Sequence, residues 1–313
     1  MKRFIVLLLA ALASVAAFSL AASAQQQAAP EEPAVGIGVE SVIVTAPALR
    51  SERALNNFIL THVAPSPLLG KIGRWKTGIC PLAVGLSSKL DTYISQRIIR
   101  VAMLAGAPLD SGETCRPNIL VVATPKPQEL LDFLRTKRPG LLGFHYQSRA
   151  ERIATMSRPI PAWYSTATED FDGFLPADAP VISWDNASPG AMGVASAVHV
   201  SGNRAIGDGL KTQFTNAIIM VDTGKIVGQE IGPLADYIAM LALSQGQSYD
   251  DCQNVPTITN LLAPGCADGM KPVALTDIDA TYLRGLYKMD AGRDFRGERS
   301  SIAYMMKKEL GGY

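Results

Sequence analysis

The side chains that most often carry out chemistry are few in this chain and poorly spaced for a shared site. The 313 residues include three histidines, which are His62, His145 and His199. None stands at the short spacing that places two imidazoles on one metal ion. We expect His62 on a helix surface and His199 on a strand. With no nucleophile elbow, P-loop, dinucleotide-binding glycine motif or calcium loop either, the sequence predicts no catalytic residue, cofactor or metal ligand.

One stretch, residues 228–247, has the frame of a zinc site without its ligands. The motif H-E-x-x-H places two histidines four residues apart, so that both imidazoles face one ion, with a glutamate base between them. Here that frame holds Ala235, Asp236 and Ala239, and a third ligand would fall at Gln245. Alanine has no lone pair to donate, and one glutamine cannot hold zinc. We interpret the stretch as a helix with a degenerate metal site; an ordinary amphipathic core helix is the alternative.

Five stretches carry a resemblance to other proteins. They read GKIGRWKTGICPLAVGL, RPNILVVATPKPQELLDFL, DTGKIVGQEIGPLADYIAMLALSQ, PTITNLLAP and LTDIDATYLRGLYKMD. In this order they resemble exported proteobacterial proteins of unknown function, over about residues 40–310. That group is similar to a broader uncharacterised family with a zincin-like helix and an "LYD"-type ending. The resemblance implies a zincin-like second half and brings no assigned activity.

The elements that would position this frame alternate between strands and helices. Alternating apolar residues and turn signals predict strands over residues 39–46, 73–87 with an interruption at Pro81, 118–124, 159–166, 180–186 and 194–202. We also expect a hairpin over 216–228 that turns at Asp222–Lys225. The helix with the zinc-type frame would follow this hairpin directly. The resulting fold class is α+β, a mixed sheet with helices and a helical C-terminal third, possibly zincin-like.

Six helices are predicted from apolar residues at helical spacing and from start and stop signals. They cover residues 51–63, 88–105, 127–139, 232–245, 276–287 and 300–310. Ser88 with Asp91, and Thr276 with Asp279, are variants of the capping box, in which side chains satisfy the free N–H groups of the first turn. These local signals favour helices that begin close to Ser88 and Thr276.

The beginning of the chain is typical of a secretory signal peptide over residues 1–24. A basic start and a long apolar run lead to an A-x-A cleavage site that ends at Ala24. An uncleaved membrane anchor is the alternative. Residues 25–38 have the composition of a flexible leader, and 39–313 would form a single α+β domain, with a possible subdomain split near residue 230. We expect cleavage near Ala24 and a periplasmic or secreted product.

The four cysteines fit an exported protein. An even number of cysteines in such a chain usually indicates disulfides rather than reactive thiols. Three pairings are possible, and we favour the two local ones, Cys80–Cys115 and Cys252–Cys266. No C-x-x-C motif is present, so we expect neither a zinc ribbon nor a thioredoxin-like site.

Charge and hydropathy limit the partners. A formal net charge of +1 gives no reason to expect nucleic acid or an anionic membrane surface. After signal cleavage no apolar run approaches the roughly 20 residues that span a bilayer, so no transmembrane segment is expected. Val42, Ile43, Val44 and Thr45 resemble the TonB box, which binds TonB by adding a strand to it. The alternative is that these residues form the first strand of the domain.

We predict an exported soluble protein that is a non-catalytic binding or interaction domain with a degenerate zincin-like fold. The alternatives are a hydrolase whose site is assembled from distant residues, and a TonB-linked periplasmic partner. An enzyme should show a pocket lined by converging polar side chains, whereas a pseudoenzyme should show small or apolar ones around Ala235 and Ala239. Leu234, Ile238 and Leu241 repeat at i, i+4 and i+7, so we expect this apolar face to pack against the preceding hairpin.

Overall fold

The structure is a computed structural model, and it describes most of the chain after residue 51. The described residues are 52–66, 69–112, 115–143, 158–170, 172–173, 208–246, 249 and 251–310. The predictions that lie outside these residues are the signal peptide, the leader, the TonB-box-like segment, the strands at 180–186 and 194–202, His145 and His199.

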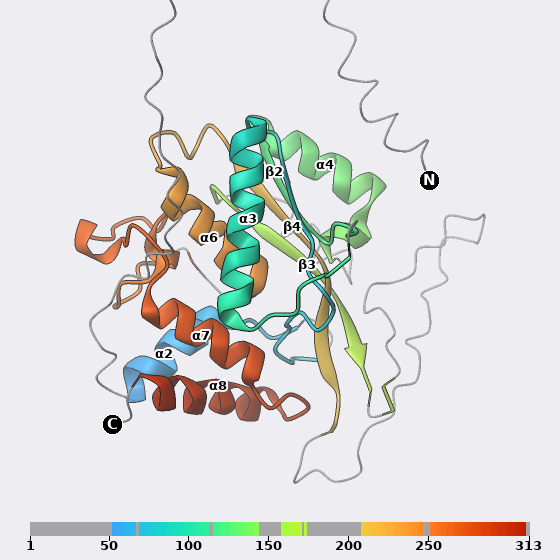
Figure 1. Cartoon of the computed structure of the whole chain (residues 1–313), viewed down its shortest axis with the longest axis vertical. Coiled ribbons are helices and arrows are strands. Elements are labelled where there is room, and N and C mark those ends of the chain that lie inside the picture. The colour runs from blue at the N-terminus through green and yellow to red at the C-terminus, as the bar shows by residue number, and fades with distance from the viewer. Residues whose placement is uncertain are drawn as a thin grey trace, which may run out of the picture. The chain divides into compact units, whose positions relative to one another are not determined.

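A mixed four-stranded sheet with the order β1-β2-β4-β3 occupies the centre of the fold (Figure 1). The strands are β1 (Pro81–Val84), β2 (Ile119–Thr124), β3 (Ala162–Glu169) and β4 (Lys211–Asp222). β1, β2 and β4 run parallel, and β3 pairs with β4 in the antiparallel direction. With helices on the sheet and a helical C-terminal part, the predicted α+β class with a mixed sheet is confirmed.

Two strand predictions are wrong. The strand region expected over 73–87 forms a strand only from its predicted interruption at Pro81 to Val84, because Pro81 has no N–H to donate to the ladder and therefore begins the strand. The hairpin expected over 216–228 does not form, since no described residues after β4 add a strand to the sheet. Instead Asp222 Oδ1 accepts a hydrogen bond from the N–H of Gly224 at 3.0 Å, which closes a turn that leads to the next helix. β4 finds its antiparallel partner in the earlier strand β3.

Helices lie on the two faces of the sheet. α3 (Ser88–Ala105) and α6 (Ile231–Leu243) contact each other, and they also contact β1 and β4 respectively. α4 (Pro127–Lys137) and the 3-10 helix Pro139–Leu142 contact β4 as well. In Figure 1, α3 passes in front of the strands, whereas α4 lies on their other side.

The alternation of side chains along β4 divides the core into two clusters. Ala217, Ile219 and Val221 belong to the large cluster that also includes α3 and α6. Ile218 and Met220, which point to the other face, pack with a smaller cluster that includes residues of α4. The large cluster draws residues from both sides of position 230.

The last two helices pack with the first described helix (Figure 1). They are α7 (Asp277–Lys288) and α8 (Phe295–Glu309), and α2 spans Glu52–His62. α8 begins earlier than the predicted 300, because Asp294 caps it by accepting a hydrogen bond from the Gly297 N–H. None of the described helices is long and apolar enough to cross a membrane.

Local capping signals explain several helix ends. Thr276 and Asp279 form the predicted capping box of α7. The prediction for α3 is displaced by one residue, since Ser87 is the N-cap and its side chain accepts from the Leu90 N–H. α3 ends at Gly106, whose φ of 73° is left-handed and suits glycine.

Both predicted disulfides are confirmed. Cys80 is bonded to Cys115 with a Cα separation of 5.9 Å, and Cys252 to Cys266 with 5.2 Å. No free cysteine is found in the described part of the chain. Disulfides of this kind are compatible with an exported protein, because they persist in oxidising compartments.

Trp75 connects the segment before β1 to α6. Its ring is 1% exposed, and its Nε1–H donates to the Ala242 carbonyl at 2.8 Å. The ring also meets Phe214 of β4 edge to face, with 5.7 Å between centroids.

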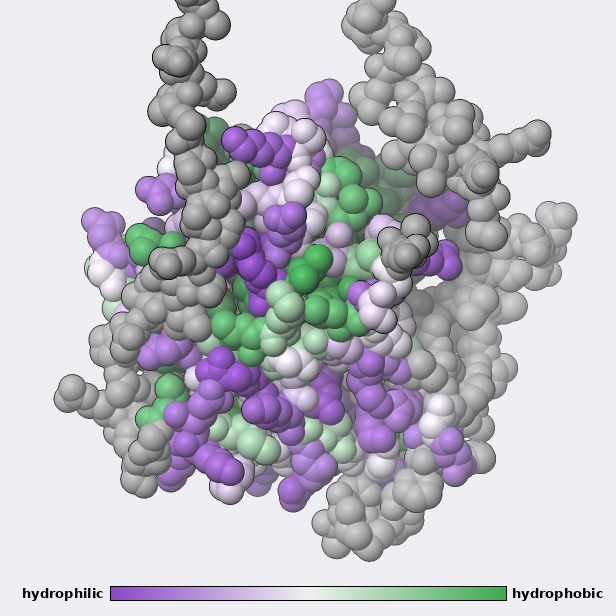
Figure 2. Space-filling view, in the orientation of Figure 1, coloured by the Kyte–Doolittle hydropathy of each residue, from purple (hydrophilic) through white to green (hydrophobic). Residues whose placement is uncertain are grey.

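On the face shown in Figure 2, hydrophobic residues gather across the middle beside α3, and hydrophilic residues predominate below.

Candidate functional site

The helix with the zinc-type frame, α6, is buried from Pro233 to Leu243. Ala235 and Ala239 are both 0% exposed, so no cleft opens at the positions where a zincin would hold its metal. The apolar face of α6 packs mainly against α3 and less extensively against β4, which supplies the first strand of the predicted hairpin. The frame is therefore part of the hydrophobic core.

Asp236, at the position of the zincin base, forms a buried ion pair with Arg97 of α3. Arg97 Nη2 donates to Asp236 Oδ2 at 2.8 Å, and its Nε donates to Oδ1. Oδ2 also accepts from the Leu275 backbone N–H at 2.8 Å. The hydrogen bonds that Arg97 donates to Asp236 raise the pKa of Arg97 above its ordinary value. Both carboxylate oxygens thus hold α3, α6 and the segment before α7 together.

Gln245, at the position of a third metal ligand, follows the end of α6. Its backbone carbonyl accepts from the Ala64 N–H at 2.7 Å, and its side-chain Oε1 is buried with no hydrogen-bond partner among the described residues. Within the described ranges no group of three or more His, Cys, Asp or Glu side chains is arranged to hold a metal ion. The four positions of the frame do not form a site together.

Comparisons with protein-family models, characterised proteins and solved structures found no match for this chain.

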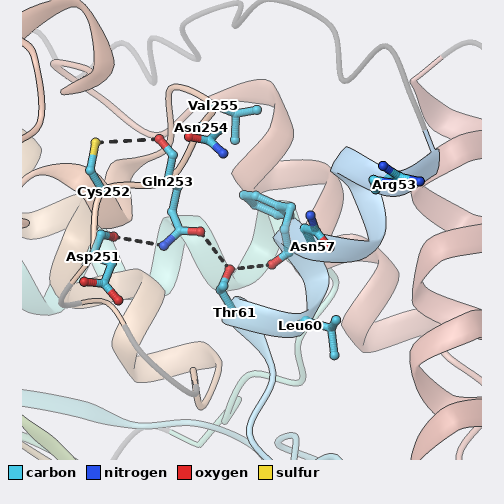
Figure 3. A pocket seen from close by; sticks show the side chains of 10 residues that line it. Arg53, Asn57, Leu60, Thr61, Asp251, Cys252, Gln253, Asn254 and Val255 are labelled. Carbon is cyan, nitrogen blue, oxygen red and sulfur yellow. Dashed lines mark hydrogen bonds between the residues drawn. The ribbon is translucent and has the colours of Figure 1, made fainter.

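An open pocket lies between α2 and the loop of residues 251–255, and we call it the α2 pocket (Figure 3). Its volume is about 620 Å³, within the usual size range of small-molecule sites. It is lined by Arg53, Asn57, Phe58, Leu60, Thr61, Asp251, Cys252, Gln253, Asn254 and Val255.

The first wall of the α2 pocket is one side of a helix. Arg53, Asn57, Leu60 and Thr61 follow at i, i+4, i+7 and i+8, so their side chains lie along the same face of α2. Phe58 is almost fully buried at 3% exposed and supplies an aromatic surface beside them. Helical periodicity alone therefore places a cation, an amide, an apolar side chain and a hydroxyl in a row.

The opposite wall is a loop fixed by a disulfide and by one side chain, Asn260. The Cys252–Cys266 bridge anchors the loop at one end. Asn260 Oδ1 accepts from the Gln253 N–H at 2.7 Å, and its Nδ2 donates to the carbonyls of Val255 and Met270, both at 2.9 Å. A carboxamide can satisfy donors and acceptors at once, so this buried residue holds the loop in one conformation.

Gln253 closes the space between the two walls. Thr61 Oγ1 donates to Gln253 Oε1 at 3.0 Å, and Gln253 Nε2 donates to the Asp251 carbonyl at 2.9 Å. By contrast, the exposed side chains of Asn57 and Asn254 have no hydrogen-bond partner within the described part. These two amides are therefore available to a ligand.

His62, which we expected on a helix surface, is fully buried behind the α2 pocket. Its ring stacks on Phe58 at 3.8 Å between centroids and packs against Tyr249 and Tyr282. Nδ1 lies 2.8 Å from the Phe58 carbonyl, which can only accept, so Nδ1 carries the proton and Nε2 accepts from the Thr259 hydroxyl at 3.1 Å. Burial lowers the pKa of His62 to about 4, so its ring is neutral at neutral pH.

The polar contacts continue from His62 into α7. Thr259 Oγ1 lies 3.1 Å from Thr257 Oγ1, which donates to Asp279 Oδ1. Asp279 Oδ2 accepts from the N–H groups of Ile258 and Thr276 at 2.9 and 3.0 Å. Burial raises the pKa of Asp279. Since none of these groups reaches solvent, the chain of contacts joins α2 to α7 and does not present a catalytic group to a substrate.

The α2 pocket was missed at the level of sequence. Its closing hydrogen bond joins Thr61 to Gln253, which are 192 residues apart. Neither wall contains a recognisable motif, because amides and apolar residues are common on any surface. The Cys252–Cys266 prediction was the one available signal, since it implied a closed loop in that region.

Proposed function

We propose that the protein is an exported, non-catalytic binding domain with a degenerate zincin-like fold, and that it binds its ligand in the α2 pocket. The observation that carries the proposal is the use of Asp236. A general base must reach the proton that it removes, and both oxygens of this carboxylate are occupied by Arg97 and by the Leu275 N–H in the core.

The chemistry of the α2 pocket supports binding over catalysis. Its charged side chains are Arg53 and Asp251, and its cysteine, Cys252, is in a disulfide. A hydroxyl becomes a nucleophile when a neighbouring base takes its proton. Thr61 lies beside Nδ1 of His62, but that nitrogen already carries a proton for the Phe58 carbonyl.

The zincin-like part of the proposal is supported by chain order. α6 follows β4 after a short turn, and strand, turn and helix are the context in which zinc metalloproteases place H-E-x-x-H. Alanine at both histidine positions keeps such a helix but removes its metal site.

The proposal is tested on the exported protein by metal analysis and by assay of peptide hydrolysis with and without a chelator. We expect no stoichiometric zinc and no chelator-sensitive activity. One tightly bound zinc per chain that is lost in Asp236→Asn would contradict the proposal, and so would peptide hydrolysis by the metal-free protein. The second result would favour a hydrolase.

A further inference from the structure

We infer that the α2 pocket accepts a short zwitterionic peptide, with its carboxylate end near Arg53 and its ammonium end near Asp251. The inference rests on the proposed function, since it names the class of ligand that the binding domain would take. It is carried by three properties of the pocket: charges of opposite sign at its two sides, unpaired amides between them, and an apolar surface beside those amides.

The two charged side chains of the α2 pocket lie on opposite sides of it. Arg53 belongs to the first turn of α2, and Asp251 is at the start of the opposite wall (Figure 3). Both side chains are exposed, and neither forms an ion pair with another described residue. A guanidinium pairs with a carboxylate through two parallel hydrogen bonds, and a carboxylate pairs with an ammonium. A ligand with both terminal charges complements both sides.

The unpaired amides suit a peptide bond. Asn57 and Asn254 each offer one carbonyl acceptor and an NH₂ donor on opposite walls. A peptide group needs both a donor and an acceptor, because its own N–H and C=O lose water on binding. A sugar or an inorganic anion would meet these amides as well, but neither has an ammonium group for Asp251.

An apolar surface accompanies the polar groups. Phe58, Leu60 and Val255 line the same pocket, and Leu60 is 36% exposed. A central apolar side chain of the peptide would lose water mainly against Leu60 and Val255, because Phe58 is only 3% exposed. The volume of about 620 Å³ accommodates a ligand of a few residues and not a folded partner.

The wall opposite α2 is already in place before a ligand binds. Asn260 and the Cys252–Cys266 bridge hold the loop, so binding does not require the loop to be ordered at that moment. A preformed wall lowers the entropic cost of association.

The test is calorimetric titration of the intact protein with the tripeptide Ala-Leu-Ala, its N-acetylated form and its C-amidated form. We expect Ala-Leu-Ala to bind, and each modification to weaken binding by about two- to fivefold, the range for an exposed charge pair. Arg53→Ala should weaken binding of Ala-Leu-Ala to a similar degree and remove the effect of amidation while keeping that of acetylation. Asp251→Asn should also weaken binding of Ala-Leu-Ala, and it should remove the effect of acetylation while keeping that of amidation.

Two exposed residues outside the pocket serve as matched controls. Arg116→Ala and Asp268→Asn remove the same charges and should leave all three affinities unchanged. Absence of Ala-Leu-Ala binding, or equal losses in the control and pocket variants, would overturn the inference and leave the non-catalytic proposal intact. Mass spectrometry of the recovered peptide distinguishes failure of the inferred ligand class from failure of the proposed function. A cleaved tripeptide would contradict the non-catalytic function, whereas charge-dependent binding would still support the ligand class.

Discussion

At the scale of single residues, the Arg97–Asp236 pair explains how a charged position of a zinc-type frame is accommodated in the core. Its side chains are 8% and 1% exposed, so either charge without the other would be buried and unpaired. We expect Arg97→Met and Asp236→Asn each to lower the free energy of unfolding by about 3–5 kcal/mol. The double variant should lose clearly less than the sum of the two, as measured by chemical denaturation.

The matched control for this pair is Lys126–Glu129, whose side chains are 69% and 72% exposed. Replacing either with alanine should change stability by only about 0–1 kcal/mol. Additive losses in the Arg97 and Asp236 variants would show that the pair is not energetically coupled.

Glu298 provides a prediction about pH. The side chain is buried, and its Oε2 accepts from the Ile72 N–H at 2.8 Å. Burial raises its pKa to about 7 from 4.5. Between these values the folded protein holds a proton that the unfolded chain has lost, so stability falls as pH rises, by about 3 kcal/mol in total. In Glu298→Gln this contribution is absent.

The measurement is the stability difference between wild type and Glu298→Gln at several pH values. The wild type should lose stability relative to Glu298→Gln as the pH rises from about 4.5 to 7. A difference that stays constant over that range would mean that Glu298 has an ordinary pKa.

His62 should have the opposite effect. Its pKa is lowered to about 4 from 6.5 by burial, so between these values the unfolded chain holds the extra proton. Stability from this group therefore rises with pH, by about 3 kcal/mol from pH 4 to 6.5. The stability of wild type relative to His62→Gln should rise over that window. Glu298 and Asp279, whose pKa values are raised, instead make stability fall as the pH rises. The stability of the wild type should therefore change less with pH than that of His62→Gln.

A relative stability of wild type over His62→Gln that falls or stays level from pH 4 to 6.5 would contradict a neutral buried ring. The chemical shifts of the His62 ring, followed by NMR over the same range, would measure its pKa directly.

At the scale of elements, α6 shows that a helix can keep the spacing of a metal site and use it for packing. Ala235 and Ala239 are 0% exposed, so an imidazole at either position must displace core atoms. We expect Ala235→His with Ala239→His to unfold the protein or lower its stability by more than about 3 kcal/mol, without zinc binding. Circular dichroism and metal analysis check this.

The control for the double variant is Met103→His on the exposed side of α3, where the side chain is 56% exposed. It should cost under about 0.5 kcal/mol. A folded double variant that binds zinc would mean that α6 opens toward a cleft, and would support descent from a metal-binding helix.

The helices could be predicted from sequence because their signals are local. Gly106 ends α3, and Thr276 with Asp279 begins α7, within a few residues of the groups that they satisfy. The cap of α3 was predicted one residue late, at Ser88, although the adjacent serine, Ser87, is the N-cap. The C-terminal part is largely helical, so most of it followed from such patterns.

At the scale of the whole molecule, the sheet and the α2 pocket could not be predicted in the same way. An apolar strand such as β4 pairs equally well with any neighbour of suitable pattern, so an antiparallel partner after Asp222 was assumed. Its antiparallel partner in the structure is β3, which precedes it in the chain. The pocket depends on Thr61 and Gln253 meeting across the chain. The two disulfides could be predicted because each closes a short segment.

Trp75 makes the docking of α6 visible in the native fluorescence of the protein. An indole that donates to the Ala242 carbonyl in an apolar environment emits at shorter wavelength than one in water. The chain has three tryptophans, so Trp163→Phe with Trp184→Phe isolates this signal. During denaturation its red shift should coincide with the loss of helical circular dichroism. A red shift that comes clearly earlier would show that the segment before β1 detaches from α6 first, so one ring would report the order in which the fold comes apart.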